Sequence, residues 1–148
     1  DNAGIGGGVN ASASASSSLC LPARSGSPRI LLTTLPEEQH GLGLLMAEAL
    51  LALDGASCVS LGTQTPLFDI AMAARSQQAE VVALSFSVAY PARQIAPQLA
   101  QLRGMLPEET ALWAGGGGAG RLGAQPGVRV LTGLQDALAA LAEWRAAH

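Results

Sequence analysis

The pattern of hydrophobic and polar positions changes at residue 29. Before it Gly, Ala and Ser dominate, whereas after it short apolar runs alternate with longer segments of helical periodicity. The short runs predict five strands, over residues 29–34, 57–61, 80–85, 110–114 and 128–131. The longer segments predict helices over residues 41–53, 92–103 and 134–146, and a further helix that begins at about residue 66. Only residues 115–127 lack a convincing helical pattern.

Strands of four to six residues separated by helices are typical of a parallel sheet with right-handed crossovers. Five strands in this rhythm predict an α/β fold, a flavodoxin-like or Rossmann-like doubly wound parallel sheet of order 2-1-3-4-5 with flanking helices. In such sheets ligands bind beyond the carboxyl ends of the strands, where the strand order reverses. The loops after the first four strands are therefore the places to search for chemistry.

The same change of pattern divides the chain into two parts. Residues 1–28 lack the apolar groups that would offset the entropy of ordering, and we expect a disordered linker or vector-derived residues there. Residues 29–148 are long enough for one core and form the predicted domain. Because no Met precedes Met46, we expect the chain to be part of a longer protein with a partner domain upstream.

Composition narrows the class of protein. The net charge is −3, and the basic residues, all Arg, are scattered along the chain, which argues against a basic nucleic-acid face within it. No apolar run approaches the roughly 18 residues needed to span a bilayer, and no signal peptide is evident. We expect a cytoplasmic protein without a membrane partner, in which Cys20 and Cys58 stay reduced.

The loop after the first predicted strand contains the most distinctive pair of side chains. Glu38 and His40 are two residues apart, so in an extended loop they project to the same side. A carboxylate that accepts the proton of one imidazole nitrogen fixes the tautomer and raises the basicity of the other nitrogen. The pair suits a metal ligand or a general base. Taken alone, it also fits a solvated loop that caps the following helix.

The other loops offer weaker signals. Thr65 and Pro66 fit the N-cap and first residue of a helix. Ser85 and Ser87 end the third predicted strand, where their hydroxyls would either bind a ligand or cap the next turn. After the fourth strand a run of glycines begins with Gly115-Gly116, which permits close approach of a ligand to the backbone.

Several alternatives fail in these loops. The glycine run formally matches G-x-G-x-x-G, but it follows the fourth strand and Pro126 interrupts what comes after, so a dinucleotide site is excluded. A phosphoacceptor receiver domain needs an Asp at the end of the third strand and a late Lys, and both are missing. Because His40 and His148 are the only histidines, a nucleophile with a His base has little support and a zinc cluster is absent.

Taken together, the loops resemble those of cobalamin-binding domains. That family has Asp-x-His-x-x-Gly after the first strand, Ser-x-Leu at the end of the third and Gly-Gly after the fourth. The corresponding residues here are Glu38-x-His40-x-x-Gly43, Ser85-x-Ser87 and Gly115-Gly116. The resemblance extends over about 120 residues, with all three motifs in order. Glu replaces Asp at the first position, and Ser87 replaces Leu, which makes that wall of the family's tail pocket more polar.

The resemblance implies a cofactor and a metal ligand. His40 would displace the dimethylbenzimidazole base of cobalamin and ligate cobalt from the lower face. Glu38 would accept a hydrogen bond from His40 and orient it.

The resemblance also implies where the nucleotide tail lies. Gly43 would let the tail enter beside the first helix, and Ser85 would hydrogen-bond the benzimidazole. The remaining positions would line the tail channel, namely Ser87, Gly115 and Gly116, with Thr65 and Pro66 as another wall.

Within the family, residues 38–46, 61–66 and 82–87 look most like the C-terminal sensor domains of MerR-type transcriptional regulators. This implies a regulatory domain without catalysis of its own, with DNA bound through an N-terminal domain outside this chain. It leaves open the form of cobalamin (adenosyl-, methyl- or hydroxo-), light sensitivity and a homo-oligomer of the full-length protein. The alternatives are a corrinoid carrier module of a methyltransferase or mutase, and an interaction module that no longer binds the ligand.

Overall fold

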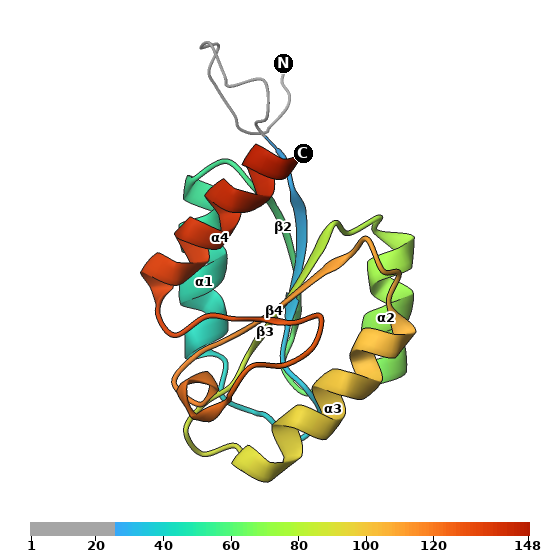
Figure 1. Cartoon of the computed structure of the whole chain (residues 1–148), viewed down its shortest axis with the longest axis vertical. Helices are drawn as coiled ribbons and strands as arrows, with labels where there is room; N and C mark the ends of the chain where they lie inside the picture. Colours follow the sequence, from blue (N-terminus) through green and yellow to red (C-terminus); the bar gives the residue numbers. More distant parts are fainter. Residues whose placement is uncertain (1–25) are drawn as a thin grey trace, which may run out of the picture.

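The predicted strands form one parallel sheet. A computed structural model of the chain describes residues 26–148 (Figure 1). The strands are β1 (Arg29–Thr33), β2 (Ser57–Gly62), β3 (Val81–Ser85), β4 (Ala111–Gly115) and β5 (Arg129–Val130). They are all parallel and lie in the order β2-β1-β3-β4-β5, which confirms the predicted topology. The strand order reverses next to β1, so the β1–α1 and β3–α3 loops lie side by side at the carboxyl edge.

Four α-helices cover the two faces of this sheet. They are α1 (Leu42–Leu53), α2 (Leu67–Ser76), α3 (Ala92–Met105) and α4 (Leu134–Ala147), with a short 3-10 helix, η1 (Ala119–Arg121), in the β4–β5 connection. Helices α1 and α4 pack on one face, and α2 and α3 pack on the other (Figure 1).

Two apolar cores result, because successive residues of a strand point to opposite faces. In β1, Ile30 and Leu32 join the core beneath α1 and α4, whereas Leu31 joins the core beneath α2 and α3. All three side chains are buried. The continuous apolar run of β1 thus reflects a strand that is covered on both faces.

The predicted bounds hold to within two residues, and one assignment at the start of α2 is wrong. Pro66 is the N-cap, with φ −60° and ψ 148°, and the helix begins at Leu67. Thr65 is therefore not the N-cap, and its hydroxyl instead lies 2.7 Å from Thr33 Oγ1. Pro66 itself has an extended ψ, so the first helical residue is one position later than predicted, and no side chain caps the helix.

The described part of the chain begins three residues before β1. Arg145 donates hydrogen bonds of 3.1 and 3.0 Å from Nε and Nη2 to the Ser27 carbonyl, and the Ser57 amide donates to Pro28 O. Residues 26–28 therefore contact the domain. The linker prediction for residues 1–25 and the prediction for Cys20 lie outside the described residues. Cys58 is a free thiol in β2.

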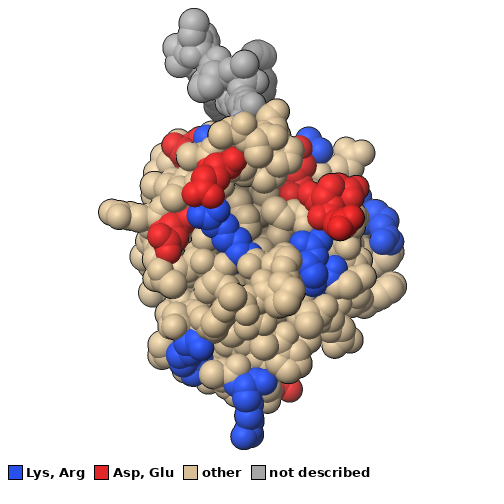
Figure 2. Space-filling model, viewed as in Figure 1, with Lys and Arg blue, Asp and Glu red and all other residues tan. Residues whose placement is uncertain are grey.

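Two surface properties bear on function. On the face seen in Figure 2, acidic and basic side chains are interspersed, and no single basic patch gathers there. Within residues 26–148 no helix combines the length and apolar character that crossing a bilayer requires.

Candidate functional site

A tight turn after β1 brings Glu38 into the protein. The Glu38 amide donates a 3.1 Å hydrogen bond to Leu35 O, with Pro36 and Glu37 as the central residues. Glu37 has φ +74°, and proline followed by a positive φ is typical of a type II turn. A non-glycine residue is rare in this region and costs about 1 kcal/mol or more. The chain thus accepts local strain where it positions Glu38.

The carboxylate of Glu38 is the hub of a polar cluster. It is 1% exposed, and Oε1 accepts a 2.6 Å hydrogen bond from the Ser87 amide. Its other oxygen, Oε2, accepts hydrogen bonds from Ser87 Oγ at 3.1 Å and from the His40 amide at 3.2 Å. His40 Nδ1 lies 3.0 Å from the same oxygen. Glu38, His40 and Ser87 therefore form one connected unit, which joins the β1–α1 and β3–α3 loops.

These contacts determine the charge of Glu38. Burial alone would raise the pKa of this carboxyl, but the hydrogen bonds from Ser87 and His40 outweigh it and lower the pKa below its ordinary value. The group is therefore an anion at neutral pH, and it can only accept hydrogen bonds.

An anionic partner fixes the tautomer of His40. Glu38 can only accept, so the Nδ1 that faces it is the donor, and in the neutral ring Nε2 is then the nitrogen with the lone pair. Nε2 has no hydrogen-bond partner among residues 26–148, and the side chain is 55% exposed. The ring is thus oriented by a buried carboxylate while its basic nitrogen remains available.

Two threonines attach this loop to the neighbouring one. Thr34 Oγ1 donates a 2.7 Å hydrogen bond to Glu38 O and accepts one of 2.8 Å from the Gln64 amide. Thr33 Oγ1 donates to Gly62 O at 2.9 Å and also contacts Thr65. Both threonines are buried, so these bonds fix the base of the β1–α1 loop against the β2–α2 loop.

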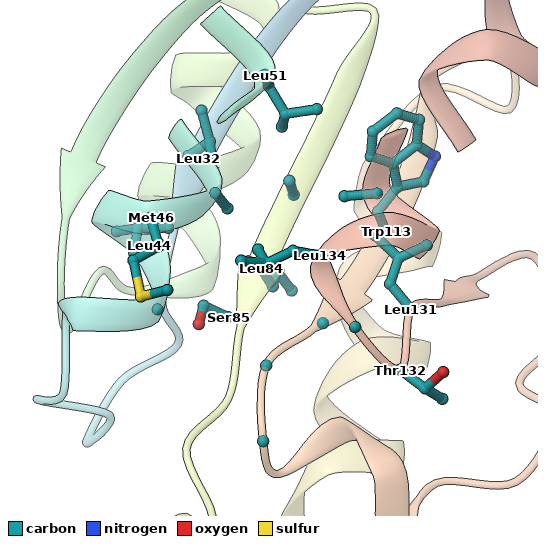
Figure 3. A pocket seen from close by; sticks show the side chains of 18 of the residues that line it. Leu32, Leu44, Met46, Leu51, Leu84, Ser85, Trp113, Leu131, Thr132 and Leu134 are labelled. Atoms are coloured by element: carbon teal, nitrogen blue, oxygen red, sulfur yellow. The ribbon is translucent and has the colours of Figure 1, made fainter. Parts of the chain in front are cut away.

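A cavity of about 300 Å³ lies between α1 and the amino end of α4, and two of its lining residues, Gly43 and Ser85, are close in sequence to His40 and Ser87. Figure 3 shows Leu44 and Met46 on one side, Trp113 and Leu131 on the other, and the Ser85 hydroxyl between them. No charged residue lines the cavity, and besides Ser85 only Thr132 contributes a hydroxyl. Its lining suits a flat, largely apolar group that needs few polar contacts.

Glycines shape the wall of this cavity. A Cβ on Gly43, in the first turn of α1, would lie 3.0 Å from Ser85 Oγ. Gly116 has φ +97°, and a Cβ there would lie 2.4 Å from Phe86 O. A Cβ on Gly115 would meet Leu131 at 3.5 Å, an ordinary contact. At Gly43 and Gly116 a neighbouring atom thus lies too close for a side chain to fit without a shift, whereas Gly115 has room for one.

The structure separates the predicted residues into three groups. Glu38, His40 and Ser87 form the polar cluster, while the cavity is lined by Gly43, Ser85, Gly115 and Gly116. Thr65 and Pro66 belong to neither group, since they lie in the β2–α2 loop and do not line this cavity.

Sequence reasoning missed several residues of the site. Trp113 lies inside the cavity at 3% exposure, and Thr132 and Leu134 close it from the start of α4. Arg121 contacts the β3–α3 loop from η1. Arg121 had a visible signal, because it is the only charged residue between Gly115 and Gly127. Trp113, Thr132 and Leu134 gave no such signal, because a core position or a helix start accounts for these residue types without a ligand.

The metal-binding capacity of the site is limited. Among residues 26–148 no three His, Cys, Asp or Glu side chains gather as a group that could hold an ion. His40 can therefore offer one ligand, and the remaining ligands of any metal would have to come with a cofactor.

Comparisons with solved structures identify the fold. The chain superimposes on a cobalamin-binding protein from Desulfitobacterium hafniense DCB-2 with a TM-score of 0.63 and 20% identity, over 78% of this chain and 58% of that one. It also matches the monomethylamine corrinoid protein of Methanosarcina barkeri with a TM-score of 0.59 and 17% identity, over 78% and 57% of the two chains. The chain therefore shares the fold of these two proteins.

A sequence comparison agrees with this fold. The HTH-type transcriptional repressor CarH of Myxococcus xanthus is 33% identical over 89 residues, which make up 60% of this chain and 30% of the repressor. The chain thus spans less than a third of CarH and less than three fifths of each structural neighbour. No family model matches the chain. The comparisons confirm the resemblance to cobalamin-binding proteins that the loop motifs predict.

Proposed function

We propose that residues 29–148 form a cobalamin-binding domain that acts as the sensor of a MerR-type transcriptional regulator. The observation that carries the proposal is the buried Glu38 carboxylate, which orients His40 and leaves Nε2 available, in a protein whose apolar cavity is lined by the nearby Gly43 and Ser85. His40 is then the lower axial ligand of cobalt, and Glu38 keeps the ring in the required tautomer.

The solitary histidine fits this cofactor. Bound cobalamin would supply the cobalt together with the four equatorial nitrogens of its corrin ring, so one protein ligand suffices. A bare ion would need several further ligands, and residues 26–148 do not gather them.

The surroundings of His40 fit the apolar part of a macrocycle. Leu42 and Val88, which follow His40 and Ser87 closely in sequence, are each 71% exposed. Met46 and Leu134 border the cavity at 47% and 41% exposure. Exposed apolar side chains that gather near a polar cluster are typical of a ligand-binding surface.

The cavity is the proposed site of the nucleotide tail. Gly43 and Gly116 leave room for it, Gly115 lines its path, and Ser85 Oγ would hydrogen-bond the base. Ser87 would act on the His40 side through Glu38, since its amide and hydroxyl both donate to that carboxylate. Thr65 and Pro66 would contribute only if the tail extends beyond this cavity to the β2–α2 loop.

The regulatory assignment is supported by the similarity to CarH. DNA would be bound by another part of the parent protein in the cytoplasm, and the domain itself would catalyse nothing. The similarity to a corrinoid protein supports a carrier module as the second candidate. A regulator changes its DNA affinity or oligomeric state with cobalamin, whereas a carrier accepts a methyl group from a partner enzyme.

The test of cobalamin binding compares the two histidines of the chain. Cob(II)alamin is added to the full chain, uniformly labelled with nitrogen-15, and electron paramagnetic resonance spectra are recorded. A protein histidine on cobalt gives doublet splitting from nitrogen-15, whereas the cofactor's own base gives a triplet. We expect the doublet for the wild type and its complete loss in His40→Ala.

The matched control is His148→Ala, because His148 lies in an exposed position at the end of α4, stacked on Trp144. This variant should keep the doublet. A doublet that persists in His40→Ala would show that His40 is not the ligand, and a wild type that binds no cobalamin would refute the proposed function.

A further inference from the structure

Arg121 joins two loops at the carboxyl edge of the sheet. Its Nη2 donates to Tyr90 O at 2.7 Å and reaches Ser87 O at 3.5 Å, while its Nε donates to Gly118 O at 3.3 Å. Ser87 and Tyr90 are the two ends of one turn, in which the Tyr90 amide donates to Ser87 O at 3.1 Å. The guanidinium therefore fixes a turn of the β3–α3 loop to the glycine-rich loop after β4.

The Ser87–Tyr90 turn in its turn contacts the β1–α1 loop, which carries His40, at two points. At one end, the Ser87 amide donates to Glu38 Oε1 at 2.6 Å. At the other, the buried Tyr90 donates from its hydroxyl to Pro36 O at 3.4 Å. Ser87 and Tyr90, the two residues whose carbonyls Arg121 contacts, are thus also the residues that hydrogen-bond to the β1–α1 loop.

The backbone supports the same connection. Phe86 N donates to Gly115 O and Gly118 N donates to Phe86 O, each at 2.8 Å. A Cβ on Gly118 would lie 2.2 Å from Ser87 O, so the two loops are in close contact where Arg121 bridges them. Gly116 and Gly117 of this segment line the cavity. The segment that carries Arg121 therefore touches both parts of the site.

We infer that Arg121 is a positioning residue for His40, acting through Ser87 and Glu38; this inference rests on the proposed function. Without the guanidinium, the carbonyls of Ser87, Tyr90 and Gly118 lose a charged donor. The turn then moves more freely, the Ser87 amide leaves Glu38 more often, and the carboxylate orients the imidazole less firmly.

The experiment compares three variants of the full chain. Arg121→Met removes the donors, and Arg121→Lys keeps the charge but loses the planar fork. Arg103→Met is the matched control, because Arg103 also donates to two backbone carbonyls, those of Gly127 and Pro107, but at the amino edge of the sheet. Each variant is studied without cobalamin by amide hydrogen exchange and nitrogen-15 resonances, and with cob(II)alamin by paramagnetic resonance.

In Arg121→Met we expect the Ser87 amide to exchange about tenfold faster, the factor that corresponds to one charge-assisted hydrogen bond. The His40 nitrogen resonances should shift toward a mixture of tautomers, and the fraction of cobalt bound to His40 should fall. Arg121→Lys should lie between Arg121→Met and the wild type, and Arg103→Met should match the wild type in all three measurements.

The outcomes separate the two claims. Wild-type exchange at Ser87 and wild-type His40 resonances in Arg121→Met would overturn the positioning role. Equal losses in Arg103→Met would also overturn it, because they would indicate a general loss of stability. If the effects in the ligand-free protein occur but no variant binds cobalamin, the positioning role stands and the proposed function fails.

Discussion

The carboxylate of Glu38 combines burial with charge. Four donors from Ser87 and His40 surround its two oxygens, and together they outweigh the cost of taking the anion out of water. Glu reaches two partners on different loops, Ser87 of the β3–α3 loop and His40 of its own loop. The hydrogen bonds that the Glu38 carboxylate accepts therefore determine how Ser87 and His40 are arranged.

The lowered pKa of Glu38 predicts a pH dependence of stability. A carboxyl whose folded pKa lies below its unfolded pKa stabilises the protein above the unfolded value, near 4.5, and this contribution is lost as pH falls through the folded value. Chemical denaturation should therefore show that Glu38→Gln costs about 1–3 kcal/mol at pH 7. The difference between the two proteins should shrink as the pH falls below 4.5 toward the folded pKa.

Other acidic groups contribute equally to the pH dependence of the wild type and of Glu38→Gln, so their contributions cancel in the difference. Asp136 and Glu143, whose pKa values are lowered by hydrogen bonds from Thr132 and Arg129, respectively, are present in both proteins. A difference between the two proteins that stays constant from pH 7 to acid would contradict the assignment of a lowered pKa to Glu38.

At the scale of elements, the end of β4 determines how closely two loops approach. Gly116 follows the last residue of the strand with φ +97°, and the backbone of Phe86 occupies the space of its missing side chain. A side chain there would have to adopt a rare backbone conformation and also push the β3–α3 loop away. The glycine run is therefore a structural requirement of the site at Gly116, independent of any dinucleotide motif.

Two glycine substitutions should have opposite effects on thermal stability. Gly116→Ala should destabilise by at least about 1–3 kcal/mol, because it combines a positive φ with a Cβ 2.4 Å from Phe86 O. Gly104→Ala, inside α3 and without a neighbour within 4 Å, should stabilise by about 0.5–1 kcal/mol. Thermal denaturation of both variants measures the contrast, and a Gly116→Ala variant as stable as the wild type would refute the close approach.

At the scale of the whole molecule, the parallel sheet places the loops after its five strands at one edge and leaves an apolar cavity between α1 and α4. The polar cluster lies in the β1–α1 and β3–α3 loops, and the cavity is lined by Gly43 and Ser85 next to those loops and by the buried Trp113. A ligand with a metal ion at one end and a flat aromatic group at the other would use both parts. Neither part alone specifies such a ligand.

The cavity predicts a preference for cobalamin over cobinamide, which lacks the nucleotide base. An aromatic ring system buries on the order of 150 Å² or more, and at about 25 cal/mol per Å² its loss should weaken binding at least tenfold. Titration with both compounds, followed by the rise in melting temperature, measures this difference. Equal affinities would mean that the tail does not occupy the cavity.

The sequence by itself determined the fold and the principal motif. The alternation of short apolar runs with helical segments is local information, and it sufficed for the element bounds, to within two residues, and for the strand order. The spacing of Glu38 and His40 was also local, and the structure bears out their hydrogen bond at 3.0 Å.

The tertiary structure alone decided which distant residues join that pair. Ser87 lies 49 positions from Glu38, and its amide forms the shortest hydrogen bond to the carboxylate. Arg121 and the start of α4 come from still later segments, and Thr65 turned out to contact Thr33 rather than to cap a helix. The physical reason is that periodicity reports which side of an element is buried, whereas contacts between loops depend on how strands are ordered and how closely backbones approach.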